Sequence, residues 1–90
     1  PVANDSHLRG SDLSRRSFVG ANFEGADLRR ANLSESDFSG ALLAGANLAG
    51  AALRETNLSG ADLRGANLRD AYAVGARFSG AIFGNTTLPG

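Results

Sequence analysis

The sequence contains no cysteine, methionine, tryptophan or lysine, and only two prolines and one histidine. Without cysteine the chain can form neither a disulfide nor a thiolate metal site. Nine arginines balance nine acidic residues, so the net charge is zero. Nucleic-acid binding needs clustered positive charge, which a neutral chain does not favour. No stretch approaches the roughly 18 apolar residues of a membrane-spanning helix, so membrane insertion is not expected either.

An internal repeat of five residues runs along almost the whole chain. Counted in fives from Leu8, sixteen of seventeen positions are leucine or phenylalanine, and the exception is Ala73. The residue two before each of these centres is Ala, Ser or Thr in every unit except at Arg16, and the residue two after is usually glycine. A helix face repeats every 3.6 residues and a strand face every second residue, so a period of five fits neither. Such a short period predicts one small structural unit copied along the chain.

Each unit is predicted to be a short extended segment followed by a tight turn. Alternate side chains of an extended segment share one side. The large centre and the small residue two before it would therefore point inward, and the residue between them outward. Glycine two residues after the centre suits a type II turn, which needs positive φ at that place. A chain that turns one corner per unit winds into a coil whose successive turns pair at about 4.8 Å.

The residues that replace glycine at the corners indicate how many sides this coil has. They are Arg15, Arg30, Glu35, Glu55, Asp70 and Asn85. With four sides, positions 20 apart stack, and Arg15, Glu35 and Glu55 fall in one column. A second column, from Gly20 to Gly80, then contains only glycine. Three sides would scatter the exceptions, so four sides are predicted, with a different type of turn after the second side.

The tandem units in "ANFEGADLRRANLSESDFSGA", residues 21–41, follow the pattern A(D/N)LXX and resemble the pentapeptide-repeat family. The resemblance covers residues 6–90 and implies an all-β fold, a right-handed quadrilateral β-helix (a solenoid) of about four coils. Residues 1–5 are expected to be an N-terminal lead-in. Because the family shares a scaffold and not a site, the resemblance implies no particular activity.

No residue pattern indicates catalysis, a cofactor or a metal. His7 is the only histidine, and cysteine is absent, so the chain lacks the several ligands that a metal site needs. A serine nucleophile could be paired with a histidine base only near His7. The acidic residues recur at repeat spacing, as expected for a solvated polar wall. We therefore expect no enzyme activity and no cofactor.

A column of arginines is the candidate for anion binding. Arg9, Arg29 and Arg69 are predicted to lie in one outward column after the first side, interrupted in one coil. Such a column could bind a phosphate or a carboxylate. The alternative is that Asp27 and Asp70 neutralise it.

Apolar residues at outward positions are the candidate partner surface. Leu42 and Ile82 replace Asp or Asn on the fourth side, and Tyr72 and Val74 lie with Ala52 on the second. Single exposed apolar residues are normal, but several together suggest a contact surface.

The break in the ladder at Ala73 leaves two arrangements open. Either Ala73 points inward and Tyr72 and Val74 stay outside, or the chain slips by one residue and one of these two turns inward. Ala71 and Ala76 still occupy small inward positions, which favours the first arrangement.

These features favour a structural or interaction protein. We expect a non-enzymatic protein–protein interaction module, a small subunit or stabilising scaffold of a larger assembly. Its partner would be another protein, or a copy of itself docked at an open end of the solenoid. The alternative implied by the resemblance is a DNA mimic that protects or inhibits a topoisomerase, which the neutral charge disfavours. The resemblance is also compatible with a thylakoid lumen, in chloroplasts or cyanobacteria, or with the cytoplasm. The first residue is Pro1 rather than methionine, which indicates a processed protein, a trimmed chain or a fragment.

Overall fold

The computed structural model describes residues 7–89. In this range a single-residue parallel β-bridge occurs at every fifth position from His7 to Thr87, and a two-residue turn follows each bridge except the last. Between residues 7 and 89 there is no helix and no strand longer than one bridged residue. The expected lead-in, residues 1–5, lies outside the described residues.

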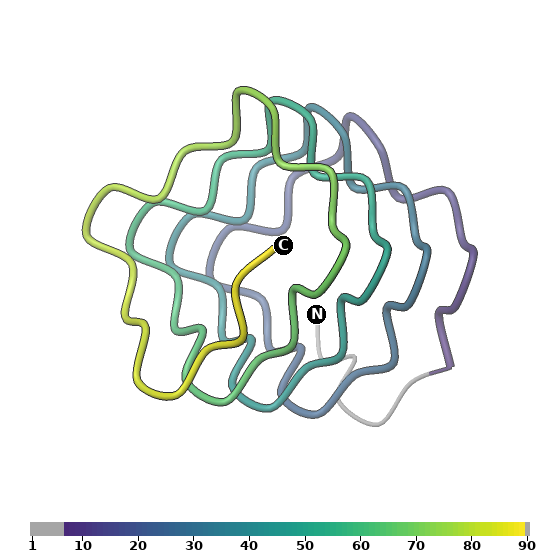
Figure 1. Ribbon diagram of the computed structural model, residues 1–90. Coiled ribbons are helices and arrows are strands. Elements are labelled where there is room, and N and C mark those ends of the chain that lie inside the picture. The colour runs from purple at the N-terminus through teal and green to yellow at the C-terminus, as the bar shows by residue number, and fades with distance from the viewer. Residues whose placement is uncertain (1–6, 90) are drawn as a thin grey trace.

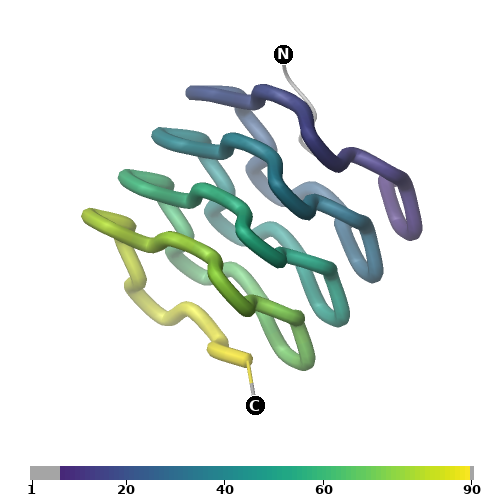
Figure 2. Tube along the Cα trace, turned by 90° about the horizontal axis from the view of Figure 1, so that it is seen from above, coloured from purple at the N-terminus to yellow at the C-terminus, as the bar shows by residue number. Residues whose placement is uncertain are grey.

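The bridges join residues that are 20 apart, so the chain winds as a coil with four sides per turn. Figure 1 and Figure 2 show the successive coils stacked in order from the N-terminal to the C-terminal end. We number the sides by their bridged residues: face one is His7, Asp27, Asn47, Asn67 and Thr87; face two is Asp12, Asn32, Ala52 and Tyr72; face three is Ser17, Asp37, Asn57 and Arg77; face four is Asn22, Leu42, Asp62 and Ile82. The four-sided winding predicted from the glycine column is confirmed.

The interior is filled by one large and one small side chain from each unit. In the middle coils the centres are fully enclosed, as at Phe38 and Leu48, and so are the small residues two before them, such as Ala46. Towards the ends of the described range the centres are less covered, and Phe83 and Leu88 are 40% and 60% exposed. The predicted inward and outward positions are therefore confirmed.

Four small inward positions in the described residues carry a hydroxyl group, at Ser11, Ser36, Thr56 and Thr86, and the last three bond to the preceding coil. Their oxygens donate to backbone carbonyls of the preceding coil over 2.6–2.7 Å: Ser36 to Leu13, Thr56 to Leu33 and Thr86 to Leu63. A buried hydroxyl without a partner would be costly, and these bonds satisfy it while they join neighbouring coils.

Every corner residue between Gly10 and Asn85 has positive φ, including those that are not glycine. The prediction of a different turn after face two is therefore wrong. Glu35 and Glu55 have φ of 61° and 56°, close to the 67° and 69° of Gly40 and Gly60 in the glycine column. An even winding needs the same bend at each corner, and a residue with a Cβ can adopt this left-handed conformation at a cost.

The Asp or Asn before each centre closes a small side-chain turn. All nine Asp and Asn residues at bridged positions accept a hydrogen bond from the backbone N–H two residues later, at 2.9–3.3 Å. This contact is an Asx turn, which stabilises a change of chain direction. It explains why the repeat pattern demands Asp or Asn at a solvent-facing position. Leu42, Ala52, Tyr72 and Ile82 occupy the same place and cannot make this bond.

Candidate functional site

An exposed apolar patch lies on face two in the last complete coil. Tyr72 bridges to Ala52, and its backbone N–H donates to the Ala51 carbonyl at 2.9 Å. Tyr72 and Val74 are 69% and 76% exposed, whereas Ala73 packs against the core. The register is therefore unbroken here, and the arrangement with Ala73 inward is the one that forms. We call Ala52, Tyr72 and Val74 the face-two patch.

The other two apolar candidates lie elsewhere. Leu42 and Ile82 are 38% and 49% exposed on face four, and each bridges to Asp62 between them. Faces two and four lie on opposite sides of a four-sided coil. The structure therefore separates the five predicted contact residues into two groups, and only the face-two patch is contiguous.

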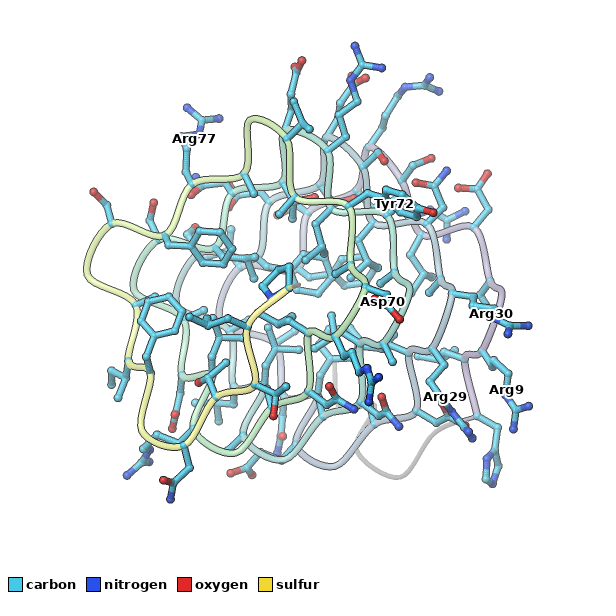
Figure 3. The ribbon with its side chains drawn as sticks, in the orientation of Figure 1. Arg9, Arg29, Arg30, Asp70, Tyr72 and Arg77 are labelled. Atoms are coloured by element: carbon cyan, nitrogen blue, oxygen red, sulfur yellow. The ribbon has the colours of Figure 1, made fainter. Side chains whose placement is uncertain are left out.

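A groove of about 530 Å³ lies at the corner between faces one and two. Its lining residues are Arg9, Arg29, Arg30, Ala49, Gly50, Asp70 and Tyr72. Arg9 and Arg29 were predicted as anion contacts from the sequence, whereas Arg30 was not placed in that column. Arg69, the third predicted contact, does not line the groove. In Figure 3, Arg9, Arg29 and Arg30 lie on the same side of the coil as Asp70 and Tyr72.

Asp27 holds the arginines at one end of the groove. The Arg29 side chain donates through Nε and Nη2 to the two carboxylate oxygens of Asp27, at 2.8 Å and 2.7 Å. Arg9 Nη2 lies 3.7 Å from the same carboxylate. The hydrogen bonds from Arg29 hold the pKa of Asp27 well below its usual range, and the pKa of Arg29 is raised in return. Asp27 therefore neutralises part of the arginine column. Asp70, which the sequence-based alternative also named, has no arginine within ion-pair distance among the described residues.

Half of the carboxylates in the described residues are paired with arginine. Of the eight carboxylates in residues 7–89, four lie within ion-pair distance of an arginine: Asp27, Glu35, Glu55 and Asp62. Arg64 binds Asp62 through two nitrogens, at 2.9 Å and 2.7 Å, and the pKa of Asp62 is lowered by this contact. The other four carboxylates of residues 7–89, Asp12, Glu24, Asp37 and Asp70, have no arginine within ion-pair distance in this range.

His7 is exposed and bridges to Asp27 on face one. Across residues 7–89 no group of three or more His, Cys, Asp or Glu side chains is placed to hold a metal ion. Within the same range the structure has no helix of the length and apolar character needed to cross a membrane.

The profile described as "Pentapeptide repeats (8 copies)" matches the sequence twice in succession, over residues 6–45 and 46–85. The chain belongs to the pentapeptide-repeat family. No significant match exists among proteins with curated functions.

Solved structures of other pentapeptide-repeat proteins are similar to this chain. A pentapeptide repeat protein from Nostoc PCC 7120 is 32% identical with a TM-score of 0.84, and the match covers 93% of this chain and 74% of that one. A second, Rfr23 from the cyanobacterium Cyanothece 51142, is 36% identical with a TM-score of 0.56, and the match covers 97% of this chain and 60% of that one. This chain thus spans less than two thirds of the Cyanothece protein.

Proposed function

We propose that this pentapeptide-repeat chain is a non-enzymatic protein-interaction module, a small subunit or stabilising scaffold of a larger assembly. The observation that carries the proposal is Tyr72. It occupies a bridged position where Asp or Asn would close an Asx turn, and its side chain is 69% exposed beside Val74. An exposed aromatic side chain that the fold does not require is typical of a protein contact surface.

The scaffold in this proposal is one domain, residues 6–90, with the right-handed quadrilateral β-helix expected for an all-β pentapeptide-repeat protein. The parallel bridges between positions 20 apart support it. The TM-score of 0.84 to the Nostoc protein supports it as well. Its walls are flat because every coil repeats the same four sides, and flat walls suit contact with another protein.

The interior offers no place for chemistry in the middle of the coil. The buried polar side chains of the described residues are Ser36, Thr56 and Asp62. The two hydroxyls bind backbone carbonyls, and Asp62 binds Arg64. None is left free to act as a base or nucleophile, which supports a non-enzymatic function.

The alternative of a DNA mimic has no support from the charge pattern. A protein that replaces duplex DNA would present a continuous negative surface, as DNA does along its backbone. Here four of the eight carboxylates in residues 7–89 are paired with arginine, and the net charge of the chain is zero.

We propose the face-two patch as the primary contact surface. A copy of the chain docked on the C-terminal end of the solenoid is a second candidate, because Phe83 and Leu88 are 40% and 60% exposed there. The two surfaces can be separated, since the patch is on a wall and the phenylalanine and leucine are on the end.

Site-specific photo-crosslinking tests the proposal. A photo-reactive phenylalanine analogue at position 74 would be activated in cells of the source organism, with position 79 as the matched control. Val74 and Ser79 both follow a centre by one residue, are both exposed, and lie on faces two and three. We expect a discrete adduct with one other protein from position 74 and none from position 79. Equal adducts from both positions would contradict the face-two patch, and an adduct with a second copy of the chain would identify that copy as the partner at this patch.

A further inference from the structure

The groove at the corner between faces one and two exists because one coil lacks side chains there. The third coil places Ala49 and Gly50 at this corner, whereas the second coil places Arg29 and Arg30 there. Arg30 leans over the gap: a Cβ added to Gly50 would lie 3.3 Å from Arg30 Cγ. The groove floor is therefore backbone and one methyl group, with charged side chains at both ends.

The arginine end of the groove keeps a surplus positive charge. Arg9 and Arg29 share the single carboxylate of Asp27. Among residues 7–89, Arg30 has no carboxylate within ion-pair distance. The arginine end therefore has three guanidinium groups and one carboxylate, that of Asp27. This carboxylate already accepts hydrogen bonds from Nε and Nη2 of Arg29.

The opposite end has a different character. Asp70 lines it and is exposed, and among the described residues no arginine lies within ion-pair distance of its carboxylate. Tyr72 lines the same groove, and its ring provides an apolar surface there. A ligand that crosses the groove would contact the arginines first, then the uncharged surface of Ala49 and Gly50, and then Tyr72 and Asp70.

We propose that this groove binds an extended peptide segment with an acidic residue at one end, whose side-chain carboxylate lies on Arg29 and Arg30, and a cationic residue at the other. The inference deepens the proposed function, because the segment is taken to belong to the partner protein. A guanidinium group pairs with a carboxylate through two parallel hydrogen bonds, which gives both strength and orientation.

The charge balance favours a carboxylate over a phosphate group. A phosphate monoester carries about −1.5 to −2 charges at neutral pH. Arg9, Arg29 and Arg30 exceed Asp27 by two charges, and Asp70 in the same groove lowers the net surplus to one positive charge. A monoanionic carboxylate matches this net surplus. A cationic group further along the same peptide would be placed near Asp70.

The dimensions suit a short extended peptide. From the coil of Arg29 and Arg30 to the coil of Asp70 there are two coil spacings, which at the strand spacing is about 10 Å. An extended chain advances roughly 3.3 to 3.6 Å per residue, so the first and fourth residues of a tetrapeptide span this distance. The cavity volume of about 530 Å³ is within the range of ordinary ligand sites.

Calorimetric titration with synthetic peptides tests the inference on the purified chain. The probe is an acetylated, amidated tetrapeptide with glutamate first, two alanines and lysine last, and the control has glutamine in place of glutamate. The reversed order, lysine first, is titrated as well, because the groove does not fix chain direction. Tyr72 is the only tyrosine and tryptophan is absent, so tyrosine fluorescence reports occupancy of this groove.

Two substitutions locate the binding. Arg30→Gly removes the charge and suits the fold, because Gly10 and Gly50 occupy the same corner with positive φ. Arg77→Ala is the matched control, since Arg77 is an exposed arginine on face three, away from the groove in Figure 3. We expect the glutamine peptide and Arg30→Gly each to weaken binding about tenfold or more, as for loss of a charge-assisted contact. Arg77→Ala should leave the affinity within about twofold.

Several outcomes would overturn the inference. They are equal affinity for the glutamate and glutamine peptides, equal affinity of the chain and Arg30→Gly, or no heat and no fluorescence change with either peptide. Displacement of the peptide by inorganic phosphate at lower concentration than by acetate would reject the carboxylate. If the peptides do not bind but position 74 still crosslinks to a partner, the proposal of peptide binding in the groove is wrong and the proposed function stands. If a peptide binds but position 74 gives no crosslink, the proposed function is wrong and the groove proposal stands.

Discussion

Asp27 and Arg29, two residues apart on face one, form an ion pair through two hydrogen bonds of 2.8 Å and 2.7 Å. The pair makes folding sensitive to acid. The pKa of Asp27 is depressed in the folded chain, chiefly by the Arg29 hydrogen bonds. An unfolded Asp titrates near about 3.9. The pair's contribution is therefore fully present above that pH and is lost as the pH falls towards the lower folded pKa.

We expect the free energy of unfolding of the unaltered chain to fall more steeply than that of Asp27→Asn between about pH 4.5 and pH 2. Asparagine can still accept the Arg29 N–H, as it does at other bridged positions, so the substitution removes the charge and keeps the turn. Urea unfolding at a series of pH values provides the measurement. Other carboxyls with lowered pKa, such as Asp37 and Asp62, contribute to both curves and cancel in the difference. If the free energies of unfolding of the two chains fall in parallel with pH, the ion pair does not contribute to stability.

The corner at Glu35 should be strained by its side chain. Glu35 has φ of 61°, and its pair with Arg15 is exposed and 3.8 Å long. Such a surface pair contributes little, whereas the left-handed conformation costs a non-glycine residue roughly 1–2 kcal/mol. We expect Glu35→Gly to raise the free energy of unfolding by up to about 1 kcal/mol, after the entropy of the more flexible unfolded chain is subtracted.

The contrasting substitution at the same corner is Glu35→Val, which should destabilise because a β-branched residue is disfavoured at positive φ. Thermal melts of both variants give the comparison. A Glu35→Val chain as stable as the Glu35→Gly chain would mean that φ does not control this corner. The different turn predicted from the sequence at this corner would have accommodated valine more easily, but the structure does not have that turn.

Substitutions at Leu48 and Asn47 compare an inward position with an outward one. Leu48 is fully buried in a central coil, so Leu48→Ala should cost about 2–5 kcal/mol in urea unfolding. Asn47 lies on the wall and loses one hydrogen bond, to the Ala49 N–H, when replaced by alanine. Its cost should be about 1 kcal/mol or less. Similar costs for the two variants would contradict the assignment of inward and outward sides.

The sequence predicted the winding because the repeat is simple. Each unit has one large inward residue, and the columns of corner residues identified four sides. The register at Ala73 was also predictable, since Ala71 and Ala76 kept their small inward places. These features follow from local spacing alone.

Other features depend on how side chains of neighbouring coils stack on one another, and these were not predicted. The turn at Glu35 was misjudged because charge and size at the corner were taken as signs of a different bend. Arg30 was missed as a groove residue because it sits at a corner rather than in the Arg9–Arg29 column. The signal that could have found it is the pair Ala49–Gly50, which leaves the space that Arg30 overhangs.

The role of Asp and Asn at bridged positions was also missed. The sequence showed that these residues face outward, and a polar wall seemed a sufficient explanation. The structure shows that each one closes a turn through the N–H two residues later. This changes the meaning of Tyr72, because a residue that departs from the pattern gives up a stabilising bond.

The substitution Tyr72→Asn should stabilise the fold and weaken binding of the proposed partner. Asparagine supplies the missing acceptor for the Val74 N–H, as Asn32 does for Ser34 at 3.0 Å on the same face. A hydrogen bond of this kind contributes about 0.5–1.5 kcal/mol, which for a chain of this size raises the melting temperature by several degrees, at about 4–8 °C per kcal/mol. The measurement is thermal unfolding of Tyr72→Asn together with crosslinking from position 74. We expect a higher melting temperature and loss of the crosslinked partner. An unchanged or lower melting temperature with the partner still crosslinked would contradict this expectation.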